Sequence, residues 1–330
     1  MEPDRTPAAR ATRPASSTER ATVDSAAGAP VVGRFAPSPT GRLHAGNLFA
    51  AVMAWCLAHR AGGKMVLRIE DLDPDRSRAA YADAIMRDYE WMGLTWDYGP
   101  YWQHGREEAY RAAYERLERA GLVYPCFCSR ADLHAASAPH FGEKLVYPGT
   151  CRALTDAERR ARAQRKDPSW RLIVPDEDVA FDDMLQGPQR QNLARECGDF
   201  VVRRADGAFA YQLAVVLDDA EQGVTQVARG IDLLPSTPQQ IHLQSLLGLP
   251  HPAYAHFPLM VNETGRRLSK RDHDASIDEL RERFRTPEAL LGRMAGASGI
   301  MPDDEPIALE DLAREADFAK LGGRISTVWE

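Results

Sequence analysis

The clearest pattern in the chain is a short apolar run followed by a turn and a long apolar helix. Residues 31–35 are β-branched or aromatic apart from one glycine and one arginine, which predicts a buried parallel strand. Two prolines and a glycine at 37–41 end that strand. A proline-free apolar segment then runs over 46–60 and stops at two glycines, which predicts a helix. The order is therefore strand, turn, helix.

The turn between these two elements has features of an anion site. It contains His44-Ala45-Gly46-Asn47, where the helix begins. Unpaired backbone N–H groups at a helix start attract anions, and His44 adds a side-chain donor. Gly46 leaves room for a base or a ribose beside the backbone. Taken alone, the His44–Asn47 motif could equally be an ordinary helix N-terminus.

A second cluster of cations lies far downstream. Four Lys or Arg residues occur within 266–271, after the apolar run 257–261. These cations repel one another unless they share an anion, and a flexible Lys270 suits charge that develops on a phosphate. A solvated basic loop is the alternative. With His44 earlier in the chain, the two clusters together favour nucleotide chemistry.

Three of the five cysteines have the spacing of a metal site. Cys126 and Cys128 form a Cys-x-Cys pair, and Cys151 follows a loop that contains proline and glycine. Structural zinc commonly holds such an irregular segment together. Three thiolates leave one position of the tetrahedron open, and three buried thiols without a metal are the alternative. The odd cysteine count fits a reducing cytoplasm better than a disulfide framework.

The composition restricts the class of protein but does not point to a particular function. The 330 residues are 44% hydrophobic and carry a net charge of −7. No apolar stretch reaches the roughly 18 residues of a membrane span, so we expect a soluble cytoplasmic protein without membrane contact. A net negative charge is unexpected for a protein that binds RNA. The basic cluster at 159–166 could still contact phosphate, and the alternative is that it forms the solvent-exposed face of a helix.

At these motifs the chain resembles class I aminoacyl-tRNA synthetases of the glutamyl type. Residues 44–47 and 267–271 match the family's HIGH-like and KMSKS-like signatures, although Asn47 replaces the second histidine. Four further stretches look like the same family, at 67–73, 211–219, 229–234 and 254–259. Within it, the cysteine pattern and the short length look most like glutamyl-queuosine tRNA(Asp) synthetases. Only 60 residues follow Lys270, so we expect no anticodon-binding domain.

The resemblance implies a role for each matching residue. Arg34 and Arg229 would bind the carboxylates of glutamate, Glu70 its amino group, and Tyr211 would shape the pocket wall. The segment Arg34, Phe35, Ala36, Pro37 and Ser38 would contact glutamate, with Ser38 as a hydrogen-bond donor. Catalysis would use His44 and Lys270, and ATP would be bound by His44, Gly46, Asn47 and Lys270. Asp218 and Asp219 are left undecided between structural and ribose-binding roles.

It also implies cofactors and partners. The zinc ligands would be Cys126, Cys128, Tyr147 and Cys151, with water or His140 in place of Tyr147 as alternatives. ATP would carry Mg²⁺. Glutamate would be activated as glutamyl-AMP without tRNA and passed to queuosine at the wobble position of tRNA(Asp), by a protein we expect to be a monomer.

Two alternatives to this function stay open. One is a truncated or discriminating glutamyl-tRNA synthetase that charges a 3′ end. The other is a zinc-containing RNA-binding protein with an inactive nucleotide fold, which intact His44 and Lys270 disfavour.

The predicted fold is an α/β Rossmann-like catalytic fold of the class I synthetases with a zinc-bearing insertion and a short helical C-terminus. The expected boundaries are a disordered tail at 1–30, the first half of the catalytic domain at 31–125, the zinc-bearing, acceptor-binding insertion at 126–198, the second half with the KMSKS-like loop at 199–274, and a helical segment at 275–330.

Overall fold

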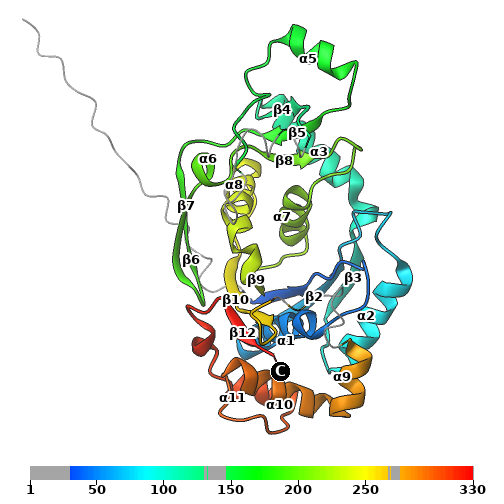
Figure 1. Cartoon of the computed structure of the whole chain (residues 1–330), viewed down its shortest axis with the longest axis vertical. Coiled ribbons are helices and arrows are strands. Elements are labelled where there is room, and N and C mark those ends of the chain that lie inside the picture. Colours follow the sequence, from blue (N-terminus) through cyan, green and yellow to red (C-terminus); the bar gives the residue numbers. More distant parts are fainter. Residues whose placement is uncertain (1–29, 130–131, 133–145, 267, 269–275, 330) are drawn as a thin grey trace, which may run out of the picture.

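A computed structural model gives the fold over residues 30–129, 132, 146–266, 268 and 276–329 (Figure 1). Its first sheet is parallel, in the order β1 (Val32–Phe35), β2 (Lys64–Ile69), β3 (Tyr98–Trp102). The connections are α1 (Ala45–Arg60) and α2 (Ala79–Trp91). The predicted strand, turn and helix at the start of the fold are thus confirmed.

A second sheet continues the nucleotide-binding body. Its order is β7 (Gly187–Asn192), β6 (Asp178–Asp183), β10 (Ala253–Phe257), β9 (Gln226–Gly230). β6, β10 and β9 run parallel, and β7 returns antiparallel to β6. The backbone N–H of Thr225 donates to Val32 O at 3.0 Å, so β1 lies beside the start of β9. The helices α7 (Tyr211–Glu221) and α8 (Thr237–Leu247) belong to this half.

A smaller antiparallel sheet forms the upper part of Figure 1, in the order β4 (Val123–Cys126), β5 (Ser169–Leu172), β8 (Phe200–Arg203). The helices along this stretch are α3 (Glu107–Arg119), α5 (Asp156–Ala163) and α6 (Leu193–Glu196). The sheet pairs strands from both sides of the boundaries expected near 125 and 198, while β6 and β7 join the second sheet. The domain boundaries stay a prediction.

The segment after the KMSKS-like stretch contains α9 (Ile277–Phe284), α10 (Pro287–Ser298) and α11 (Leu309–Glu315). It also holds one strand that the sequence analysis did not foresee, β12 (Ser326–Val328), which pairs in parallel with β11 (Leu259–Val261). Within the described residues there are also three short 3₁₀ turns, η1 (Gln103–Arg106), η2 (Ile231–Ser236) and η3 (Phe318–Leu321).

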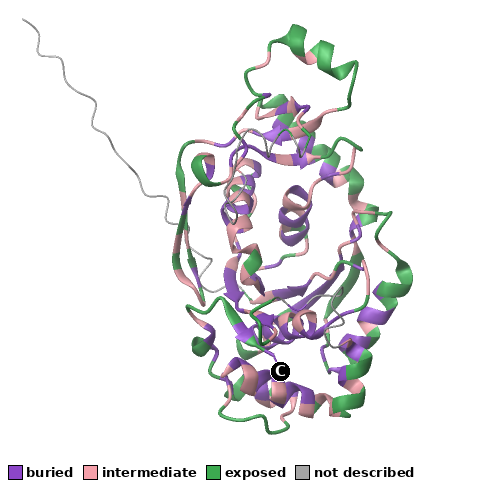
Figure 2. Ribbon diagram, viewed as in Figure 1, coloured by how far each residue is buried: buried purple, intermediate pink, exposed green. Residues whose placement is uncertain are grey.

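Helix α1 lies at the centre of the largest hydrophobic cluster, between the parallel sheet and the C-terminal helices (Figures 1 and 2). Its sequence has no charged residue before its final Arg60, so it is apolar on every side, and a helix of that kind is stable only when it is surrounded. Cys56 is fully buried there, as a core residue should be. Burial on every side therefore fixes α1 within the core.

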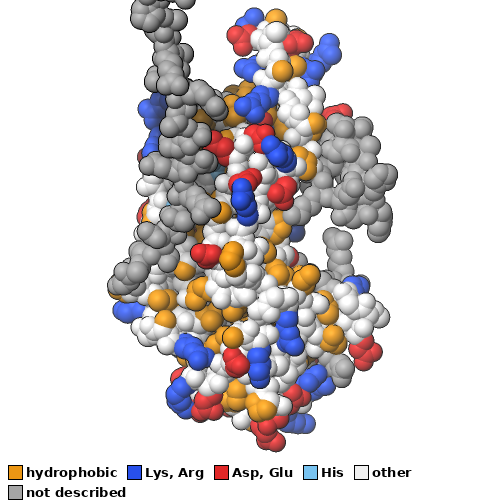
Figure 3. Space-filling view, turned by 90° about the vertical axis from the view of Figure 1, so that its left-hand side faces the viewer, with side chains coloured by type: hydrophobic (Ala, Val, Ile, Leu, Met, Phe, Trp, Pro, Cys, Tyr) orange, Lys and Arg blue, Asp and Glu red, His pale blue; other side chains and the backbone are white. Residues whose placement is uncertain are grey.

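On the face in Figure 3, Lys and Arg side chains are interspersed with Asp and Glu. No helix in the described part of the chain has both the length and the apolarity that crossing a bilayer requires.

Candidate active site and metal centre

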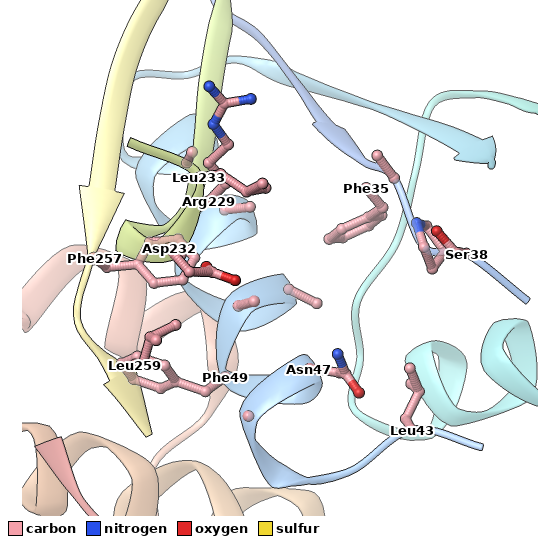
Figure 4. Close-up of a pocket in the computed structure, with 18 of the residues that line it drawn as sticks. Phe35, Ser38, Leu43, Asn47, Phe49, Arg229, Asp232, Leu233, Phe257 and Leu259 are labelled. Atoms are coloured by element: carbon pink, nitrogen blue, oxygen red, sulfur yellow. The ribbon is translucent and has the colours of Figure 1, made fainter. Parts of the chain in front are cut away.

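One pocket of about 490 Å³ lies where β1 and β9 end and α1 begins. It gathers every described residue that the sequence analysis assigned to glutamate or ATP, namely Arg34, Phe35, Ala36, Pro37, Ser38, His44, Gly46, Asn47, Glu70, Tyr211 and Arg229. Lys270 lies outside the described residues. Figure 4 shows Phe35 and Ser38 on one side of the pocket, Asp232 and Leu233 on the other, and Asn47 at the start of α1.

Two buried guanidinium groups line this pocket. Arg34, on β1, is 5% exposed, donates from Nη1 to Ala228 O at 3.3 Å, and lies with Nε 3.5 Å from Asp219. Burial lowers the pKa of Arg34, opposed by the charge of Asp219. Arg229, on β9, is also 5% exposed and is held from Nε and Nη2, while its buried Nη1 has no hydrogen-bond partner among the described residues. Arg229 therefore keeps an unused buried donor, and both cationic groups line the pocket, which suits an anionic ligand.

A network of buried charges holds Glu70 at the pocket wall. Arg68 is fully buried and donates to Glu70 Oε1 at 3.2 Å and to Asp219 Oδ1 at 2.7 Å. Burial raises the pKa of Glu70, opposed by the charges of Arg68 and Arg34. Tyr211 begins α7 beside these groups, and burial raises the pKa of its phenol. The carboxylate is thus fixed in place and available to an ammonium group.

Asp218 and Asp219, whose roles the sequence left undecided, belong to the scaffold. Asp219 binds Arg68 and approaches Arg34, as above. Asp218 is fully buried and accepts from Gln103, Arg106 and Tyr110 at 2.6–3.0 Å. Neither is among the residues that line the pocket.

The start of α1 lies at the pocket, which His44, Gly46 and Asn47 line. The backbone N–H of His44 donates to Asn47 Oδ1 at 3.3 Å, so the Asn47 side chain caps the helix. A Cβ at Gly46 would lie 3.2 Å from the His44 ring, so the glycine lets that ring pack against the turn. Leu268, the one described residue between 267 and 275, is buried and its N–H donates to Met260 O at 3.2 Å. The start of the KMSKS-like stretch therefore lies beside the pocket.

Sequence reasoning missed several residues of this site. Arg229 Nε donates to His256 Nε2 at 2.9 Å, and Arg229 Nη2 donates to Thr237 Oγ1 at 2.7 Å. The other ring nitrogen of His256 lies 2.6 Å from Asp183 Oδ2. His256 stood in a stretch that resembled the family, but only the fold shows that it touches Arg229. Asp232 and Leu233 also line the pocket and had no role assigned.

The three cysteines predicted to bind zinc come together at the end of β4. Their Sγ atoms all lie within 4.8 Å of one another, and Cys128 and Cys151 are 3.6 Å apart. Tyr147 Oη lies 3.4 Å from Cys126 Sγ and accepts from the Cys151 N–H at 2.9 Å. Zn–S bonds of about 2.3 Å place sulfurs about 3.8 Å apart in a tetrahedron. The thiols and the phenol therefore fit a four-coordinate metal, while His140 lies outside the described residues.

The charges around this cluster favour a thiolate but not a phenolate. Burial opposes ionisation of Cys126, yet hydrogen bonds, the strongest from Tyr147, lower its pKa overall. Burial, with the hydrogen bond to Cys126, raises the pKa of Tyr147. The guanidinium of Arg171 stacks 3.8 Å from the Tyr147 ring centre and donates to Cys126 Sγ at 3.2 Å. The Tyr147 phenol would lose its proton only to a strong local charge such as a bound metal ion.

The fold and this pocket define a class I aminoacyl-tRNA ligase. The chain belongs to the family described as "tRNA synthetases class I (E and Q), catalytic domain", whose model matches residues 30–316. The family resemblance read from the motifs is confirmed.

The most specific likenesses are to one kind of enzyme within that family. The chain is 50% identical to the glutamyl-Q tRNA(Asp) synthetase of Symbiobacterium thermophilum, over 88% of this chain and 93% of that protein. It is 49% identical to the enzyme of the same name from Geobacter sulfurreducens, over 82% and 88%. Among solved structures, it is similar to a glutamate tRNA ligase from Elizabethkingia meningosepticum in complex with its amino acid, with 26% identity, a TM-score of 0.76, and coverage of 92% of this chain and 67% of that one.

Proposed function

We propose that the protein activates L-glutamate with ATP to glutamyl-AMP and transfers the glutamate to queuosine at the wobble position of tRNA(Asp). The observation that carries this proposal is the pocket in which Arg34, Arg229 and Glu70 converge beside the start of α1. The names of the 50% and 49% identical relatives support the same acceptor.

Glutamate recognition follows from the charges that line the pocket. Arg34 and Arg229 offer two guanidinium groups to the two carboxylates, and the Glu70 carboxylate meets the ammonium group. Glutamine would leave a buried guanidinium without its anion, which costs several kcal/mol. The pocket therefore favours the acid over the amide.

The chemistry of activation needs no protein nucleophile. One glutamate carboxylate oxygen attacks the α-phosphorus of ATP, the bond to the bridging oxygen breaks, and pyrophosphate leaves. Mg²⁺ carried by the ATP phosphates would offset their negative charge. His44 and the backbone N–H groups at the start of α1 stabilise the phosphate charge that develops. Lys270 is the sequence-based candidate for the same task on the leaving pyrophosphate. A hydroxyl of the queuosine cyclopentenediol then attacks the acyl carbon, and AMP leaves.

The metal centre has a structural part in this proposal. Zinc bound by Cys126, Cys128, Cys151 and Tyr147 would hold the segment after β4 against the β4–β5–β8 sheet. This centre is separate from the pocket, since none of its four residues lines it. The cytoplasm and the monomeric state remain sequence-based expectations that go with the proposal.

Acceptor specificity is tested by supplying radiolabelled glutamate, ATP and Mg²⁺ with three RNAs. These are tRNA(Asp) containing queuosine, the same tRNA without it, and queuosine-containing tRNA(Asp) that lacks its 3′-terminal adenosine. The proposal predicts that the first and third accept glutamate and the second does not. Charging that is lost with the 3′ adenosine would instead identify a glutamyl-tRNA synthetase.

A further inference from the structure

A buried chain of hydrogen bonds leads away from Arg229. Asp183, at the end of β6, and His256, on β10, have fully buried side chains, and Asp183 Oδ2 lies 2.6 Å from His256 Nδ1. His256 Nε2 accepts from Arg229 Nε at 2.9 Å. Arg229 and His256 are paired in the register of β9 and β10, so the sheet itself brings the two side chains together.

The partners of Asp183 fix which nitrogen of His256 carries the proton. Asp183 Oδ1 accepts from three backbone N–H groups, those of Leu185, Gln186 and His256, at 2.9–3.1 Å. These donors, with His256, lower the pKa of Asp183 despite its burial, so Oδ2 faces the ring as a carboxylate oxygen. The ring therefore donates from Nδ1 and keeps Nε2 as an acceptor. Only this tautomer can accept the Nε–H of Arg229.

The position of the guanidinium follows from these contacts. Nε is held by His256 and Nη2 by Thr237 Oγ1, which leaves the buried Nη1 as the donor without a partner among the described residues. These two hydrogen bonds, with the covalent attachment of the group at Cδ, give three points that are not in line and so fix the plane of the guanidinium. Arg229 lines the pocket, so a guanidinium held in this way does not have to be ordered when the ligand arrives.

We propose that Asp183 and His256 are positioning residues that hold Arg229 ready for a carboxylate of glutamate. The inference rests on the proposed function, since it assigns glutamate as the ligand of Arg229. Asp183 fixes the tautomer of His256, and His256 fixes the plane of the guanidinium. Neither Asp183 nor His256 is among the residues that line the pocket.

Asp183→Asn is the sharpest variant because it removes no volume. The three backbone donors hold the amide oxygen in the place of Oδ1, so the amide NH₂ turns toward His256 and donates to Nδ1. His256 must then carry its proton on Nε2, where it opposes the Nε–H of Arg229. We expect the KM for glutamate to rise about tenfold to a hundredfold, while the KM for ATP stays within about threefold of the wild type.

Two substitutions of His256 separate positioning from packing. His256→Gln places an amide oxygen about where Nε2 lies and can still accept from Arg229, whereas His256→Asn reaches only about as far as Nδ1. We expect His256→Gln to keep most of the glutamate affinity and His256→Asn to lose it. His251→Asn is the control, since His251 precedes β10, contacts Ser245 at 3.2 Å and lies outside the pocket.

The measurement is glutamate-dependent exchange of pyrophosphate into ATP, with each substrate varied in turn and thermal unfolding recorded for each variant. ¹⁵N chemical shifts of the His256 ring report its tautomer independently. An unchanged KM for glutamate in Asp183→Asn, or equal rises in both KM values, would overturn the positioning role while leaving the proposed function intact. Absence of exchange by the wild type would overturn the proposed function, and with it this inference.

Discussion

Arg68 is the residue whose removal should damage the site scaffold most. Its guanidinium is fully buried and donates to Glu70 at 3.2 Å, to Asp219 at 2.7 Å and to Gln222 at 2.9 Å. Arg68→Met preserves most of the volume, but among the described cationic side chains it leaves Asp219 only the 3.5 Å approach of Arg34 Nε. Removing one partner of a buried ion pair typically costs about 3–5 kcal/mol. We expect a loss of that size in the free energy of unfolding at pH 7.

The dependence of this loss on pH distinguishes a charge effect from a packing defect. Without Arg68 the buried carboxylates acquire raised pKa values in the folded state, so the folded variant binds more protons than the unfolded chain. Its stability therefore falls as the pH rises through those values, and the deficit shrinks toward pH 5.

Urea unfolding followed by tryptophan fluorescence measures the effect. Arg42→Met is the control, because the ion pair of Arg42 with Asp278 is 42% and 63% exposed and should contribute less than about 1 kcal/mol. A loss below about 1 kcal/mol in Arg68→Met, or one that is the same at pH 5 and pH 7, would show that the charge of Arg68 does not hold these buried carboxylates.

Three further predictions concern the ligands. Arg34→Met should raise the KM for glutamate about a hundredfold in pyrophosphate exchange without changing the KM for ATP, and equal effects on both would contradict its role. Burial raises the pKa of Glu70, so the KM for glutamate should rise as the pH falls from 7 toward 5 and the carboxylate takes up a proton. Glu70→Gln should show a high KM that does not change with pH. A wild-type KM that is the same at pH 5 and pH 7 would count against the role of Glu70. Purified protein should contain about one zinc per chain by elemental analysis, and Cys151→Ser should lose both the metal and thermal stability. A wild-type protein without zinc would disprove the zinc site.

The parts of the site that could be predicted lie close together in the sequence. The segment from Arg34 to Asn47 contains a strand end, a turn and a helix start, and each has its own local signal. The strand, the helix and the turn that lines the pocket between them are therefore read from one stretch of the chain. The cysteine cluster could be predicted for the same reason, because the spacing of Cys126 and Cys128 is local.

What could not be predicted depends on register between distant strands. Asp183 and His256 meet only because β6 pairs with β10 at Asp183 and Tyr254, and neither sequence neighbourhood points to the other. Arg68 stood in a stretch that resembled the family, but its contacts with Asp219 require the packing of α7 beside β2. A buried polar network is specified by tertiary structure, so its members have no periodicity by which they could be recognised.

The proposed function requires that the pocket binds free glutamate and ATP together and joins them. Its most direct test is exchange of labelled pyrophosphate into ATP by the purified, zinc-loaded protein with Mg²⁺, in the absence of tRNA, with glutamate or glutamine as the amino acid. We expect exchange with glutamate and little or none with glutamine. No exchange with glutamate, or equal exchange with both, would contradict the proposed function.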